Sequence, residues 1–152
     1  MNTEMTISIL NSFIIINDAR IERYKTASTD AEESFLKKTF INFQKTSQAC
    51  KSQLTAEIIK LGGTPVIEKN HESFLDMIWL KISKILISKD SQDIIYSCNR
   101  NDNIIIQTYY EAIYNNPEYL TNKQKAMLND QYYLINEDRA MMKSLKKQST
   151  TY

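Results

Sequence analysis

The sequence predicts an all-α protein whose four long helices pack as a bundle. Its 152 residues contain only two glycines and two prolines, whereas a sheet protein needs frequent turns, which usually contain Gly, Pro or Asn. Apolar residues recur at helical spacing through four long segments and one shorter one. Because no low-complexity linker divides the chain, we expect a single domain over residues 1–152.

The first two predicted helices form a tight hairpin. They span about residues 6–27 and 30–61, and the stretch "STDAEE" between them supplies cap-type residues followed by acids that suit the first turn of a helix. The stretch "GGTP" ends the second helix, because Gly62 suits a left-handed cap and Pro65 prevents continuation. A tight connection makes the two helices antiparallel neighbours.

The remaining predicted helices span about residues 72–87, 91–114 and 121–147, with breaks at "SKDSQD" and "NNPEYLT". Long helices of about 22–32 residues are roughly 33–48 Å long, and they bury one-sided stripes best against each other. The connection over residues 62–90 is long enough to return along the bundle, which makes the second and fourth segments parallel. Two hairpins joined by one long crossover form the ferritin-like arrangement.

Charge and hydropathy exclude several classes of partner. The net charge is +1, from 19 basic and 18 acidic residues, which gives no general field for nucleic acid or anionic lipid. No apolar run approaches the ~18–20 residues of a membrane span. The first 19 residues lack Lys and Arg, so the charged start of a secretory signal is missing. Cys50 and Cys98 lack metal-ligand spacing and fall on apolar stripes, so we expect buried, reduced thiols in a cytoplasmic chain.

Four stretches carry a resemblance to a known family: "NDARIERY", "KSQLTAEIIKLGGTP", "FLDMIWLKI" and "NEDRAM". Together with the layout, they resemble a bacterial family of ferritin-like four-helix proteins of unknown function, over about residues 8–146. The "LGGTP" end and the helix with Trp79 are the most specific parts. The resemblance implies a cytoplasmic bundle with suspected stress or metal-related roles. Several members are more acidic where this chain has "CNRNDN", and carry His in place of Glu137.

A ferritin-like di-iron site needs an inward Glu from each of two helices and a Glu-x-x-His pair from each of the other two. None of the four long segments carries such a pair, and the single histidine, His71, lies in the crossover. At 100° per residue, Asp18 lies at the flank of its helix and Glu22 faces outward, as salt-bridge acids would. The inward polar side chains are instead Asn17, Ser47, Cys50, Asp102, Gln131 and Asp138.

This interior set admits two interpretations. Its weak candidates for a cation site are Asp102, Asp138, Gln131 and Asn17. The favoured interpretation is a buried hydrogen-bond network, because unpaired buried carboxylates are costly and need a partner. The candidate partners for the acids are Arg20, Arg100 and Arg139. We predict no catalytic residue, no metal and no cofactor.

The leading functional hypothesis is therefore a non-enzymatic ferritin-like bundle that acts through protein contacts, as a homodimer, without nucleic acid or membrane partners. The resemblance adds a stress-related role. Tyr110 and Tyr133, which must leave the apolar stripes, are expected interface residues. The alternatives are an iron or manganese oxidase or peroxide-handling protein with a reduced ligand set, and a storage or scaffold shell.

Overall fold

The structure, a computed structural model, describes residues 2–67 and 91–150. These residues contain no strand, and they form the helices α1 (Thr3–Asp30), α2 (Ser34–Lys60), α4 (Ser91–Tyr110) and α5 (Asn122–Thr150). A π-helical turn (Glu111–Asn115) and a 3-10 turn (Pro117–Tyr119) join α4 to α5. The predicted long helices are confirmed, but α1 is longer at both ends and contains Ser28, Thr29 and Asp30, the residues expected to cap the next helix. The helix α2 begins only at Ser34, and its N-cap, Glu33, makes no side-chain capping hydrogen bond. The expected helix over residues 72–87, with Trp79, and the neighbouring His71 lie outside the described residues.

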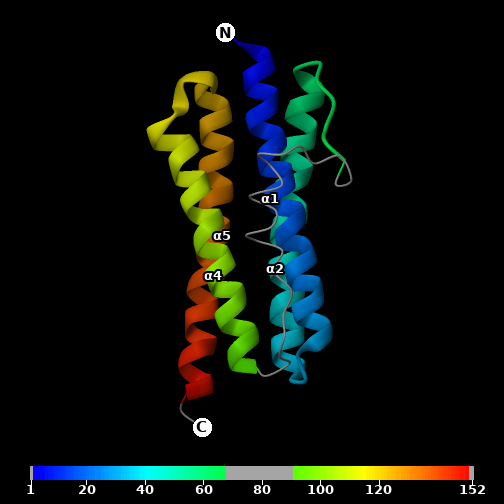
Figure 1. Ribbon diagram of the computed structural model, residues 1–152, viewed down its shortest axis with the longest axis vertical. Coiled ribbons are helices and arrows are strands. Elements are labelled where there is room, and N and C mark those ends of the chain that lie inside the picture. Colours follow the sequence, from blue (N-terminus) through cyan, green and yellow to red (C-terminus); the bar gives the residue numbers. More distant parts are fainter. Residues whose placement is uncertain (1, 68–90, 151–152) are drawn as a thin grey trace.

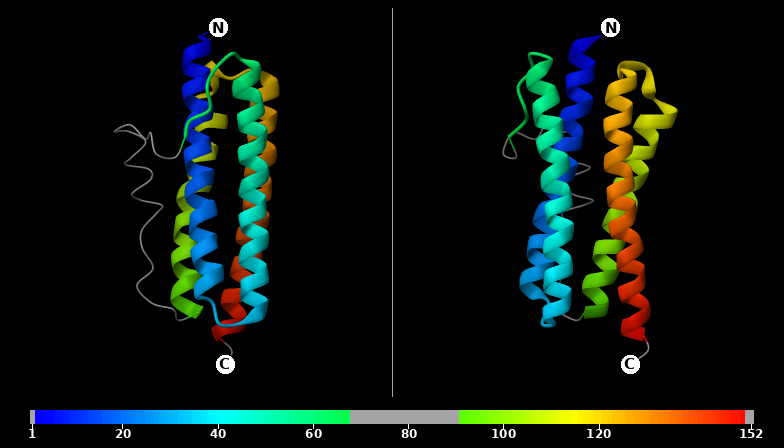
Figure 2. Two further views of the ribbon diagram at one scale, coloured as in Figure 1. Left: turned by 90° about the vertical axis from the view of Figure 1, so that its right-hand side faces the viewer. Right: turned by 180° about the vertical axis from the view of Figure 1, so that it is seen from behind.

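The four helices lie side by side in two antiparallel hairpins, α1 with α2 and α4 with α5 (Figure 1). The chain runs in the same direction in α2 and α4, as predicted from the long connection between them (Figures 1 and 2). Contacts of α1 with α4 and of α2 with α5 close the bundle. Within the described ranges, no helix is long and apolar enough to cross a membrane.

Local side-chain chemistry fixes the helix ends. The Asn2 side chain caps α1 by accepting a hydrogen bond from the Met5 amide at 3.1 Å. At the end of α2, Gly62 adopts a left-handed φ of 84°, which confirms the interpretation of "GGTP". Thr121 and Gln124 form a reciprocal capping box at the start of α5, with side-chain to amide distances of 3.1 and 2.9 Å.

The apolar interior is divided into two clusters along the bundle. One gathers Leu10, Phe13, Leu54, Ile58, Ile105, Leu128 and Ile135 with their neighbours, and the other gathers Tyr24, Phe40, Phe43, Ile94, Cys98, Met142 and Leu145 with theirs. A full burial contributes about 1.5–3 kcal/mol for each large aliphatic or aromatic side chain. Between the clusters lie buried polar side chains, including Asn17, Arg20, Ser47, Asp102 and Gln131. The bundle therefore places its chemistry at mid-height, in the interior.

Candidate functional site

The Arg20 guanidinium lies at the centre of a buried ion cluster, and all five of its N–H groups have an acceptor. Nε donates to Asp102 Oδ1 at 2.9 Å, and Nη2 donates to Asp102 Oδ2 at 3.3 Å and to Asp138 Oδ2 at 3.0 Å. Nη1 donates to the Phe43 carbonyl and to Ser47 Oγ, both at 3.0 Å. Since a guanidinium carries five donors, none is left unsatisfied at this fully buried position.

The cluster joins all four long helices. Arg20 comes from α1, Ser47 from α2, Asp102 from α4 and Asp138 from α5. Tyr24, one turn after Arg20, donates its hydroxyl to Asp102 Oδ2 at 2.5 Å, and its ring centroid lies 4.9 Å from the Arg20 Cζ. The Asp102 carboxylate therefore accepts three hydrogen bonds. Such a network fixes the position of each helix along its neighbours. Apolar contacts alone would let one helix slide along the next.

The charges in the cluster are strongly coupled. Burial by itself lowers the pKa of Arg20, but the negative charge of Asp102 and the other acidic neighbours raise that pKa above its ordinary value, so the guanidinium stays charged. Burial raises the pKa of Asp138 against the opposing pull of Arg20. Burial also raises the pKa of Tyr24, which keeps its hydroxyl neutral and able to donate. The Asp138 side chain is 16% exposed, so water reaches the second carboxylate of the cluster.

A second polar chain crosses the bundle near the first. The Asn17 Nδ2 donates to Tyr109 Oη at 2.9 Å, and the Tyr109 hydroxyl donates to Gln131 Oε1 at 2.7 Å. Gln131 Nε2 donates to the Cys50 carbonyl at 3.3 Å and to Gln53 Oε1 at 3.0 Å. These contacts pair two buried amides through one tyrosine, so Tyr109 is the central member of the chain.

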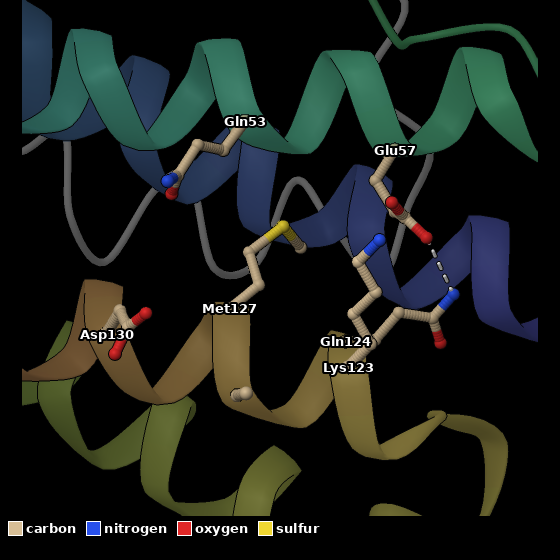
Figure 3. A pocket seen from close by; sticks show the side chains of 7 residues that line it. Gln53, Glu57, Lys123, Gln124, Met127 and Asp130 are labelled. Atoms are coloured by element: carbon tan, nitrogen blue, oxygen red, sulfur yellow. Dashed lines mark hydrogen bonds between the residues drawn. The ribbon is translucent and has the colours of Figure 1, made fainter.

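The polar chain reaches a pocket between α2 and α5 (Figure 3). This pocket of about 310 Å³ is lined by Gln53, Glu57, Lys123, Gln124, Ala126, Met127 and Asp130. Gln124 donates to Glu57 at 3.2 Å across its wall, which ties the start of α5 to the end of α2. No sequence pattern singled out this pocket. The signal that could have placed Gln124 at the start of α5 is its spacing from Thr121, which is typical of a capping box.

The four candidate ligands all occupy the interior, but they do not converge on one point. Asp102 and Asp138 meet at the Arg20 guanidinium, whereas Asn17 and Gln131 meet at the Tyr109 hydroxyl. The interior is therefore organised as two hydrogen-bonded groups. This arrangement is the predicted network, with Arg20 as the arginine that pairs the acids.

The hydrogen-bonding roles of two buried tyrosines were not predicted from the sequence. The hydroxyls of Tyr24 and Tyr109 hold the two groups together, although both rings fall on the predicted apolar stripes. A buried tyrosine usually needs a hydrogen-bond partner, which is the signal that points to such roles. Arg100 is exposed on α4 and does not pair the acids.

The prediction that Asp18 is a salt-bridge acid is confirmed, because it pairs with the Lys51 Nζ at 2.7 Å. Its side chain is only 6% exposed, however, and this burial was not predicted. The physical reason is that α1 is enclosed on every side over residues 13–20, all of which are buried. Glu22 is exposed, as predicted.

The donor set of the bundle interior does not fit a ferritin-like di-iron centre. Among the residues that the structure describes, no three His, Cys, Asp or Glu side chains gather closely enough to hold a metal ion. Both carboxylates of the ion cluster are already bonded to a guanidinium, whose positive charge repels a second cation. Burial raises the pKa of Cys50 to about 11, which keeps that thiol protonated. The one Glu-x-x-His spacing in the sequence, Glu68 to His71, lies outside the described residues.

A solved structure has a similar fold. It is described as a dodecameric thioferritin, the bacterioferritin-related protein from Bacteroides fragilis. The TM-score is 0.71 at 15% sequence identity, and the match covers 99% of this chain and 87% of that chain. At this identity the likeness shows the fold, and the fold is ferritin-like.

The expected homodimer is corrected by this comparison. The similar protein is a dodecamer, which is a higher oligomer than the dimer that we predicted. Apolar stripes and exposed tyrosines on one chain indicate where contacts form, but they do not set how many subunits those contacts bring together.

A family model defines the relationship of the sequence itself. The model described as "Domain of unknown function (DUF2383)" matches residues 5–115, which is most of the chain. A comparison with curated proteins finds no match. The chain belongs to this family, and its bundle makes it a ferritin-like member of a family of unknown function.

Proposed function

We propose that the chain is a non-enzymatic, cytoplasmic ferritin-like protein that acts through protein contacts. The observation that supports this proposal is the Arg20 guanidinium, bonded through all five N–H groups in the bundle interior. Ferritin-like enzymes place carboxylates and histidines in the bundle core to bind metal, and catalysis needs an open coordination position. Here the two interior carboxylates neutralise an arginine instead.

The alternative is an iron or manganese oxidase, or a peroxide-handling protein, with a reduced ligand set. This alternative is supported by the position of Asp102 and Asp138, whose carboxylates both lie next to the Arg20 guanidinium in the core. That hypothesis requires Arg20 to leave its acceptors, which would break five hydrogen bonds in a buried position. The closed ion cluster is therefore the better-supported state.

Consumption of oxygen and peroxide distinguishes the two proposals. With Fe(II) or Mn(II) added under matched buffer conditions, we expect the rates with the protein to equal those of the buffer, because no open metal position forms. An oxygen or peroxide electrode measures both rates. A rate clearly above the buffer that disappears in Asp102→Asn would contradict the non-enzymatic proposal and favour the alternative.

A face of exposed tyrosines on the α4–α5 hairpin supports a role through contacts. Tyr110, Tyr114 and Tyr133 are 42%, 53% and 60% exposed. The rings of Tyr110 and Tyr114 lie 4.8 Å apart between centroids, and the Tyr114 hydroxyl bonds Asn129 on α5 at 3.1 Å. Tyrosine is enriched in interface cores, since it buries a large ring and keeps a polar end. We propose that further copies of this chain cover this face, in an assembly of more than two subunits.

Light scattering tests the assembly directly. We expect a mass above twice that of the single chain, and a lower mass for the double variant Tyr110→Ser/Tyr133→Ser, which loses two rings from the face. The matched control is Tyr96→Ser, an equally exposed tyrosine near the other end of α4, which should leave the mass unchanged. A wild-type mass that never exceeds that of a dimer would contradict the proposal.

A further inference from the structure

The acceptors around Arg20 form a shell that matches a flat cation in shape as well as in charge. Asp102 binds the guanidinium through two oxygens, at 2.9 and 3.3 Å, in the paired geometry of an arginine–carboxylate bridge. Asp138, Ser47 and the Phe43 carbonyl accept the remaining N–H groups, all at 3.0 Å. Each of these acceptors comes from α2, α4 or α5, whereas the arginine comes from α1.

Two features hold this shell in place without help from the methylene chain of Arg20. The Tyr24 hydroxyl bonds Asp102, which orients that carboxylate. The Phe43 carbonyl and Ser47 belong to the interior of α2, whose backbone is fixed by its own helical hydrogen bonds. The shell is therefore preorganised, and preorganised acceptors bind a free ligand at a smaller entropic cost.

We infer that this shell is a guanidinium-binding site whose ligand is tethered by the chain itself. Truncation of Arg20 at Cβ removes the tethered ligand and leaves the acceptors, so the Arg20→Ala protein takes up free guanidinium ion from solution. The shell has this shape and charge whether or not the chain has an enzymatic role.

The geometry favours a guanidinium over a compact metal ion. The acceptor oxygens lie at hydrogen-bond distance from three separate nitrogen atoms, which are Nε, Nη1 and Nη2 of Arg20. A divalent metal bonds oxygen at about 2.0–2.6 Å from a single centre, so the shell would have to contract around it. A planar cation with five N–H groups satisfies every acceptor without such a movement.

The partly exposed acid gives the ligand a route to the site. The Asp138 side chain is 16% exposed, while that of Asp102 is 2% exposed. A small cation therefore meets Asp138 first, on the α5 side of the bundle, and passes from it to the buried carboxylate.

Thermal unfolding of Arg20→Ala tests the inference. At a guanidinium concentration ten times its Kd, we expect the Tm of this variant, followed by circular dichroism, to rise by about 3–5 °C. At about 20 mM the general denaturing effect of guanidinium is negligible and opposite in sign. NaCl supplies a cation of the same charge without the planar shape, and urea supplies a similar planar shape without the charge. Neither compound should raise the Tm at the same concentration. The wild-type protein, whose site is filled, should not respond to any of the three.

Further variants and outcomes decide the result. The double variant Arg20→Ala/Asp102→Asn should lose the rise, because it lacks the two-oxygen acceptor. If Arg20→Ala does not fold alone, its helical signal should return on refolding with guanidinium, and failure to return would overturn the inference. An unchanged Tm of folded Arg20→Ala, or an equal rise with NaCl, would also overturn it. A larger rise with Mn(II) would show that the shell selects charge rather than planar shape, and would overturn it too.

Discussion

Replacing Arg20 with methionine is expected to lower the free energy of unfolding by about 3–5 kcal/mol. Methionine fills part of the space but leaves Asp102 and Asp138 buried without a counter-charge, and it removes five hydrogen bonds. Urea unfolding at neutral pH, followed by circular dichroism, measures the change. A loss of this size is a large fraction of the free energy of unfolding of an ordinary domain, so we expect partial unfolding at room temperature.

The control and the pH dependence make this prediction specific. Arg100→Met, on the exposed side of α4, should change the stability by less than about 0.5 kcal/mol. Burial already raises the pKa of Asp138 against the opposing pull of Arg20, so loss of Arg20 moves the folded-state pKa of this carboxyl further above its unfolded value. The folded variant then binds protons more readily than the unfolded chain does. The loss in free energy of unfolding caused by Arg20→Met should therefore shrink as the pH falls through the raised pKa. A deficit below about 1 kcal/mol at neutral pH would contradict the structural role of Arg20.

Replacing Tyr109 with phenylalanine is expected to cost about 1–3 kcal/mol, because it leaves buried polar groups without partners. The Asn17 Nδ2 loses the Tyr109 acceptor and the Gln131 Oε1 loses its donor, while the ring itself keeps its packing against Phe13. Asn17, Gln131 and Tyr109 are all 0% exposed, so water does not replace the missing hydroxyl without disturbing the core. The same urea titration measures the cost.

The next residue along the chain is the matched control. Tyr110→Phe removes the same hydroxyl from a side chain that is 42% exposed, and should change the stability by less than about 0.5 kcal/mol. Equal effects of the two substitutions would contradict the assignment of Tyr109 to a buried hydrogen-bond chain.

Much of the fold was predictable because apolar spacing and helix-end signals are local. The stripes gave the long helices, and "GGTP" and "NNPEYLT" gave two of their ends. The end of α4 was less accessible, since the segment from Glu111 becomes π-helical. Glu111 bonds Gln107 at 2.9 Å and Asn115 at 2.7 Å, and these side-chain contacts form only once the turn has taken shape.

The candidate site was predictable in its members but not in its connections. Helical angles placed Asn17, Asp102 and Gln131 in the interior, because the angle depends only on position along a helix. Which side chains meet depends on the axial offset between helices, and sequence spacing does not supply that offset. The burial of Asp18 was not predicted for a related reason, since the one-sided stripe does not describe a helix that is enclosed on every side.

The metal content of the purified protein tests most directly whether an arginine fills the place of a metal. The protein is loaded with Fe(II), Mn(II) or Zn(II), freed of loose metal by desalting, and analysed by plasma mass spectrometry beside Asp102→Asn and Asp138→Asn. We predict far less than stoichiometric metal in the wild type, and no difference among the three proteins, because Arg20 already neutralises both carboxylates. Near-stoichiometric iron or manganese in the wild type, lost in either variant, would contradict this interpretation of the bundle interior.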